Sequence, residues 1–243
     1  MTLLIRKHAV FYAAVSCCAI LALYVFLQSL PDNRHLPVFS SMDISSITVV
    51  IDPGHGGEDG GAVSADGTGE SQLNLEVSLR LNDLLRFIGQ RTQMTRTEDI
   101  SIHTEGDTIR ARKASDIRNR VSLVNSTPNA VLLSIHQNSL PSSPVTHGAQ
   151  VFWNRQEGGE VLANVLQDAL NQSINPGNEK HPKPIPATIY LMKHVTAPAA
   201  LVECGFLSNQ AETALLRHPA YQTKLAMAIA AGFLRVLAGE EIP

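Results

Sequence analysis

The order of apolar and polar residues divides much of this chain into two kinds of segment. From Ile47 onward, short runs of β-branched and aliphatic residues are separated by segments in which apolar residues recur every three or four positions. The first pattern is typical of buried strands, and the second is typical of amphipathic helices. Strands that alternate with helices indicate an α/β fold. We therefore expect a single three-layer domain with a mostly parallel twisted sheet flanked by helices.

The predicted elements can be placed along the domain. The predicted strands cover residues 47–51, 130–135, 148–153, 189–192 and 200–203. Helical spacing of apolar residues predicts helices over residues 73–88, 111–124 and 161–170, the first of them ended by Gly89. Two more helices are expected at the end of the chain. Asn209 is suited to cap the first of these, and Pro219 is suited to begin the last.

The chain before the domain has a different character. Residues 9–30 contain no charged side chain and follow Arg6 and Lys7. A run of this length can cross about 30 Å of hydrocarbon as a helix, and basic residues on its N-terminal side favour a cytoplasmic start. We therefore expect a cytoplasmic segment over residues 1–8, a transmembrane anchor over residues 9–30 and an extracytoplasmic remainder. A signal peptide is the alternative interpretation of residues 9–30.

Composition and charge limit the classes of molecule that the protein is expected to bind. Residues 31–46 are rich in proline and serine and are expected to form a linker, so the predicted domain covers residues 47–240. The chain has 19 Lys+Arg against 22 Asp+Glu, and this lack of a basic surplus argues against nucleic-acid binding. Cys17 and Cys18 lie in the apolar run, which leaves Cys204 alone in the domain. No disulfide is expected there.

Polar residues suited to metal binding or proton transfer stand where predicted strands end. His55 follows the first strand closely, His136 follows residues 130–135, and Glu203 closes the strand of residues 200–203. In open α/β sheets, ligands bind beyond the carboxyl ends of the strands. Two histidines and a carboxylate can hold a catalytic zinc ion and leave one position for water. A carboxylate that closes an apolar strand needs a polar partner, which makes Glu203 a candidate general base.

The spacing of residues along the chain does not by itself identify the third metal ligand. Glu70 begins a predicted helix after a glycine-rich stretch that can fold the chain back toward His55. It is equally suited to stabilise the positive end of that helix. Glu58 and Asp59 stand closer to His55 in the sequence and are rival ligands, although acidic residues in turns are more often simply solvated. Arg120 and Asn138 are candidates for residues that order the site, and structural bonding of the neighbouring chain is an equal alternative for both.

These motifs together resemble the zinc-dependent N-acetylmuramoyl-L-alanine amidases of type 3. The resemblance rests on IDPGHGGEDGGAV, on a glutamate that opens the first helix, on RVSLVN leading into SIHQNS, and on LVECGFLSN. It implies that His55, Glu70 and His136 bind Zn²⁺ and that Glu203 is catalytic. The implied reaction is hydrolysis of the amide bond between the lactyl group of N-acetylmuramic acid and L-alanine in the peptidoglycan stem peptide.

Within this family, the expected anchor, the lone catalytic domain and residues 110–125 resemble the spore-cortex or germination type. This resemblance implies a role in forming muramic lactam together with a muramic acid deacetylase, in the cell wall or the space between the forespore membranes. The interval between residues 148–153 and 189–192 is too short for the inhibitory helix of division-type relatives. Regulation is therefore expected to come from expression, location or a partner, which includes an activating partner. A zinc peptidase that cuts within the stem peptide and a non-catalytic wall-binding module are the alternatives.

Overall fold

A six-stranded sheet runs through the part of the chain that the computed structural model describes, residues 46–240 and 242. The strand order is β2-β1-β3-β6-β4-β5. Strands β1, β2, β3 and β6 run parallel, whereas β4 is antiparallel to β6 and parallel to β5. The strands are β1 (Thr48–Pro53), β2 (Arg91–Met94), β3 (Ala130–Asn138), β4 (Gln150–Trp153), β5 (Lys183–Pro184) and β6 (Ala199–Phe206).

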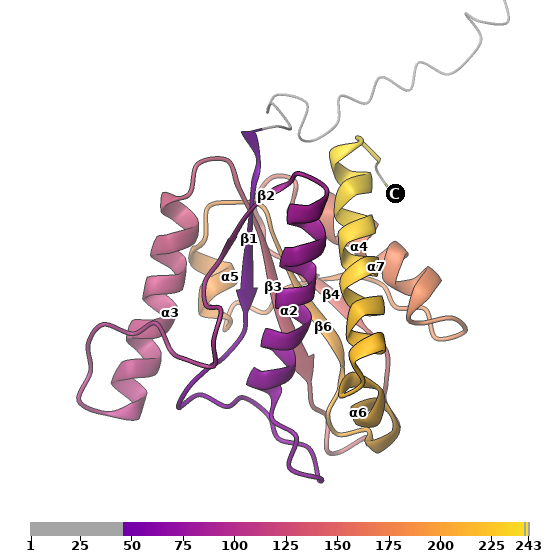
Figure 1. Ribbon diagram of the computed structural model, residues 1–243, viewed down its shortest axis with the longest axis horizontal. Helices are drawn as coiled ribbons and strands as arrows, with labels where there is room; N and C mark the ends of the chain where they lie inside the picture. Colours follow the sequence, from indigo (N-terminus) through magenta and orange to yellow (C-terminus); the bar gives the residue numbers. More distant parts are fainter. Residues whose placement is uncertain (1–45, 241, 243) are drawn as a thin grey trace, which may run out of the picture. The chain divides into compact units, whose positions relative to one another are not determined.

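Helices cover both faces of this sheet (Figure 1). One face packs against α2 (Glu70–Phe87), α4 (Gly159–Ser173) and α7 (Pro219–Leu237), with the short α6 (Gln210–Leu216) joined to the same core. The other face packs against α3 (Ile109–Ser126) and α5 (Tyr190–His194). The three-layer α/β architecture and the mostly parallel sheet are therefore confirmed.

The central strands are apolar because both of their faces are covered. In β1, Val49 and Ile51 belong to the large core beneath α2, α4 and α7, whereas Val50 belongs to the smaller core beneath α3 and α5. Helix α3 contributes little to that smaller core. Its fully buried residues are Ser115, Arg120 and Val124, so polar contacts account for much of its attachment to the domain.

Two parts of the expected secondary structure differ from the structure. The strand predicted over residues 189–192 is wrong, because Ile189 caps helix α5 and residues 190–192 lie within it, with Leu191 and Met192 buried against the smaller core. A short apolar run does not distinguish a strand from one turn of a buried helix. The edge strand β2 was not predicted, because its residues are Arg91, Thr92, Gln93 and Met94 and show no apolar run.

The predictions for the N-terminal segment concern residues that the structure does not describe. Residues 1–8, the expected anchor over residues 9–30, and residues 31–45 of the expected linker lie outside the described residues. Among the residues that are described, no helix combines the length and the apolar character needed to cross a membrane.

Candidate metal centre

His55 stands just beyond β1 in an unusual backbone conformation. Its φ angle is 61°, in the left-handed region that residues with a side chain seldom adopt. Two buried arginines hold this turn. Arg120 donates to the carbonyl oxygens of His55 (2.7 Å) and Pro53 (2.8 Å), and Arg96 donates to those of Pro53 and Gly54 (both 3.0 Å). Three successive carbonyls are thus fixed, and the side chain of His55 is presented at the carboxyl end of the sheet.

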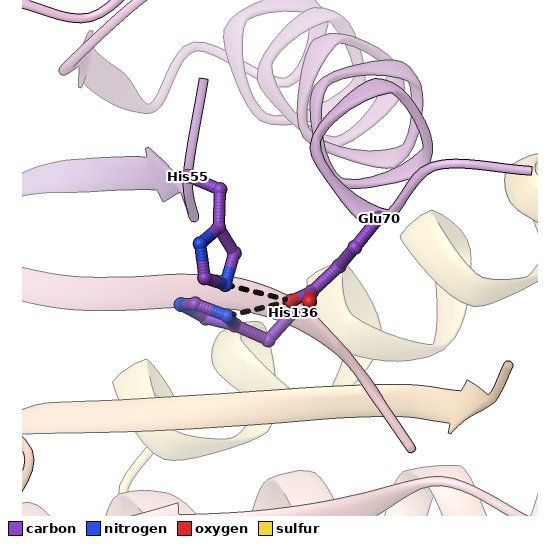
Figure 2. Close-up of side chains that lie close together, drawn as sticks. All are labelled: His55, Glu70 and His136. Atoms are coloured by element: carbon purple, nitrogen blue, oxygen red, sulfur yellow. Dashed lines mark hydrogen bonds and ion pairs between the residues drawn. The ribbon is translucent and has the colours of Figure 1, made fainter. Parts of the chain in front are cut away.

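Three side chains from separate elements converge at this end of the sheet (Figure 2). Glu70 Oε1 lies 3.2 Å from Nε2 of His55 and 3.0 Å from Nδ1 of His136. One candidate ligand atom from each residue lies within 4.8 Å of the other two. The set has two imidazole nitrogens and one carboxylate oxygen, which are donors that suit a metal ion such as zinc.

The carboxylate of Glu70 is held in one orientation. Its Oε2 accepts a hydrogen bond from the backbone N–H of Ala62 (2.8 Å), and the side-chain amide of Asn74 donates to Oε1 (3.3 Å). Burial alone would raise the pKa of Glu70, but hydrogen bonds with His136 and His55 hold it well below its usual range. Glu70 is therefore ionised at neutral pH, with Oε1 directed toward both histidines.

His55 lies between two carboxylates. Its Nδ1 is 3.0 Å from Oδ2 of Asp59, on the opposite side of the ring from Glu70. Burial lowers the pKa of His55, but the hydrogen bonds and charges of Asp59 and Glu70 outweigh this effect and raise the pKa to about 9. The expectation that Asp59 is merely solvated is wrong, because its carboxylate contacts His55 directly.

Glu203 lies beside the three converging residues. On β6 it pairs in register with His136 on β3. Its Oε2 is buried and has no hydrogen-bond partner within the described part of the chain. Burial raises the pKa of Glu203 to about 7, the charge of Glu70 adds to this rise, and His136 and His55 oppose it. A carboxyl group with this pKa can both accept and donate a proton near neutral pH.

A cavity of ≈ 420 Å³ opens over these residues. His55, Glu70, His136 and Glu203 all line it, together with residues of α3 and α5. Its position at the carboxyl ends of β1, β3 and β6 agrees with the usual place of ligand sites in parallel sheets. The cavity can therefore bring a substrate group close to Glu203 and the three converging residues.

Comparison with known proteins identifies the family. The family model described as N-acetylmuramoyl-L-alanine amidase matches residues 49–235. The chain belongs to this family. It is 37% identical over 217 residues to the germination-specific N-acetylmuramoyl-L-alanine amidase of Bacillus subtilis (strain 168), and the alignment covers 89% of this chain and 90% of that relative. The chain is thus an N-acetylmuramoyl-L-alanine amidase, a hydrolase that acts on peptidoglycan.

Solved amidase structures share the fold. The CwlD amidase of Clostridioides difficile, solved in complex with the GerS lipoprotein, superposes with a TM-score of 0.76 at 33% identity, covering 80% of this chain and 100% of that one. An N-acetylmuramoyl-L-alanine amidase from Clostridium difficile 630 gives a TM-score of 0.70 at 27% identity, with 81% and 99% covered. Both alignments extend over most of the described amidase domain.

The fold brings together the four residues to which the family resemblance assigns the site. They are His55, Glu70, His136 and Glu203. Glu70, which spacing left undecided, contacts both histidines, whereas its rival Glu58 pairs with Arg112 on α3. Arg120 donates to the carbonyl oxygens of the His55 turn, which agrees with either interpretation of this residue, ordering of the site or bonding of the neighbouring chain. The sequence does not predict that Arg96 also donates to carbonyl oxygens of this turn. No local pattern marks it, because its partners stand 42 and 43 positions earlier in the chain.

Proposed function

We propose that this amidase uses a zinc ion, held by His55, Glu70 and His136, to hydrolyse the bond between the lactyl group of N-acetylmuramic acid and L-alanine. The observation that carries the proposal is the convergence of these three side chains beside Glu203, whose buried Oε2 has no other partner in the described residues. When bound, zinc supplies a Lewis acid that polarises a carbonyl group and lowers the pKa of water.

Glu203 is the residue that moves protons in this proposal. Its Oε2 accepts a proton from the attacking water and then donates it to the departing nitrogen of L-alanine. Both steps are accessible because the pKa of Glu203 is raised to about 7. Glu70 is unsuited to this role, since its pKa is held well below its usual range and both of its oxygens already accept hydrogen bonds.

The bond that is cut can be identified by mass spectrometry. Purified peptidoglycan is digested with the zinc-loaded full-length protein and, in parallel, with a Glu203→Ala variant. We expect free stem peptides that begin with L-alanine in the first digest and none in the second. Fragments cut within the stem peptide would favour a zinc peptidase instead. Equal release by the Glu203→Ala variant would contradict the role given to Glu203.

The proposed setting is the spore cortex. It is supported by the name of the germination-specific relative from Bacillus subtilis and by the likeness to CwlD, which was solved with the GerS lipoprotein. The proposal includes an activating lipoprotein partner, a membrane anchor over residues 9–30 that keeps the domain outside the cytoplasm, and a muramic acid deacetylase that acts on the product. Adding such a deacetylase to the digest should yield muramic lactam. An equal yield without the amidase would exclude this coupling.

A further inference from the structure

Asp59 occupies the side of the His55 ring that faces away from Glu70. Asp59 Oδ2 lies 3.0 Å from Nδ1 of His55, while Nε2 of the same ring lies 3.2 Å from Oε1 of Glu70. When His55 is neutral and its proton lies on Nδ1, toward Asp59, its lone pair lies on Nε2. The carboxylate of Asp59, 3.0 Å from Nδ1, therefore favours the form of neutral His55 whose Nε2 lone pair faces the converging residues.

Two glycines create this contact. Gly56 and Asp59 exchange backbone hydrogen bonds of 2.8 and 3.2 Å, which close a tight turn. The φ angles within it are 132° at Gly56 and 58° at Gly57, a region in which glycine is favoured. A Cβ at position 56 would also lie 2.4 Å from the carbonyl oxygen of Ile100. The Gly-Gly pair thus folds Asp59 back onto His55, four residues earlier.

The other oxygen of Asp59 is held from helix α3. Lys113 Nζ lies 2.7 Å from Asp59 Oδ1, and both residues line the cavity over His55. Directly beside this pair, Glu58 and Arg112 join the same turn to the same helix at 2.7 Å. Within the described residues, neither Glu58 nor Arg112 forms a hydrogen bond or ion pair with His55. Two adjacent ion pairs therefore join this turn to α3, and of these two only the Asp59–Lys113 pair also contacts His55.

We propose that Asp59 is a positioning residue for the metal centre: it fixes the ring of His55 so that Nε2 faces the metal, and Lys113 in turn orients Asp59. This inference rests on the proposed zinc centre formed by His55, Glu70 and His136. A carboxylate on the outer nitrogen of a ligating histidine fixes the ring and strengthens the ligand, and its loss typically weakens metal binding by about 10–100-fold.

Zinc affinity of the full-length protein tests the inference, measured by competition with a chromophoric chelator. Asp59→Ala is expected to weaken zinc binding by about 10–100-fold, and Lys113→Ala is expected to weaken it less. Asp59→Asn keeps an acceptor oxygen and should recover part of the affinity. Glu58→Ala, which removes the adjacent ion pair, is the matched control and should bind zinc as the wild type does.

Two further readouts separate positioning from a general structural role. The visible bands of the Co²⁺-loaded protein should shift in Asp59→Ala and stay unchanged in Glu58→Ala, while the metal-free variants should unfold at similar temperatures. Equal zinc affinity in the wild type and Asp59→Ala would overturn the inference, and so would equal weakening in Asp59→Ala and Glu58→Ala. If His136→Ala bound zinc normally, the proposed centre itself would be wrong. Weak binding by His136→Ala with normal binding by Asp59→Ala would overturn the inference alone.

Discussion

Replacing Glu203 with glutamine is expected to lower kcat by about 10²–10⁴-fold, the usual contribution of a general acid–base residue, while zinc content stays unchanged. The glutamine amide has nearly the shape of the carboxyl group, but it neither accepts nor returns a proton. Glu203 Oε2 has no hydrogen-bond partner within the described residues, so little of the surrounding structure depends on its charge. Turnover on purified muropeptides and metal analysis of the same samples give the two quantities.

Glu212 provides a matched control for this substitution. It is also a largely buried glutamate, but its two oxygens accept hydrogen bonds from the backbone N–H groups of Gly148 (2.8 Å) and Phe206 (2.7 Å). Glu212→Gln is therefore expected to reduce stability while leaving the turnover of the folded fraction close to that of the wild type. The proton-transfer role of Glu203 would be refuted by near-normal turnover in Glu203→Gln, or by loss of zinc from that variant.

Substituting Gly54 with alanine is expected to disable the metal centre almost completely. A Cβ at this position would lie 2.1 Å from Cε1 and 2.2 Å from Nε2 of His136, far inside contact distance. The loop has no easy way to retreat, because Arg96 and Arg120 hold its carbonyl groups. The His136 ring must therefore leave its place beside Glu70. Zinc binding should weaken by more than the roughly 10–100-fold typical of outer-shell changes.

Gly60 is the control for this second prediction. It belongs to the same glycine-rich stretch, but a Cβ added there would have no other atom within 4 Å. Gly60→Ala should bind zinc and hydrolyse muropeptides as the wild type does. Isothermal titration calorimetry with zinc on both variants makes the comparison. Wild-type affinity in Gly54→Ala, or an equal loss in both variants, would show that contact with the His136 ring is not the cause.

The sequence predicts the fold well wherever burial is regular. Strands β1, β3 and β6 are covered on both faces and appear as continuous apolar runs, and the apolar spacing of α2 and α7 marks the faces that they bury. The polar edge strand β2 and the short helix α5 have no such signal. Their conformations follow from tertiary contacts, since β2 pairs with β1 and α5 packs its buried residues under the sheet.

The candidate site is predictable to a similar extent. His55, His136 and Glu203 can be found because each stands at or just beyond the apolar part of a central strand. Glu70 is ambiguous from spacing alone, since the path of the chain before it depends on turns with left-handed glycines such as Gly61. Asp59 and its link to helix α3 depend on a contact 54 positions apart in the sequence, which no local pattern reveals.

The arginine contacts around the His55 turn bear on how the proposed metal centre would be loaded. Because Arg96 and Arg120 order the turn through protein contacts, the ion has little backbone to organise, and most of the conformational entropy of the turn is lost during folding. We therefore expect loading of the proposed metal centre to be separate from folding, unlike in small zinc domains that fold only around their ion. We expect that a chelator can remove the proposed zinc ion from the folded domain and that added zinc can restore it without refolding.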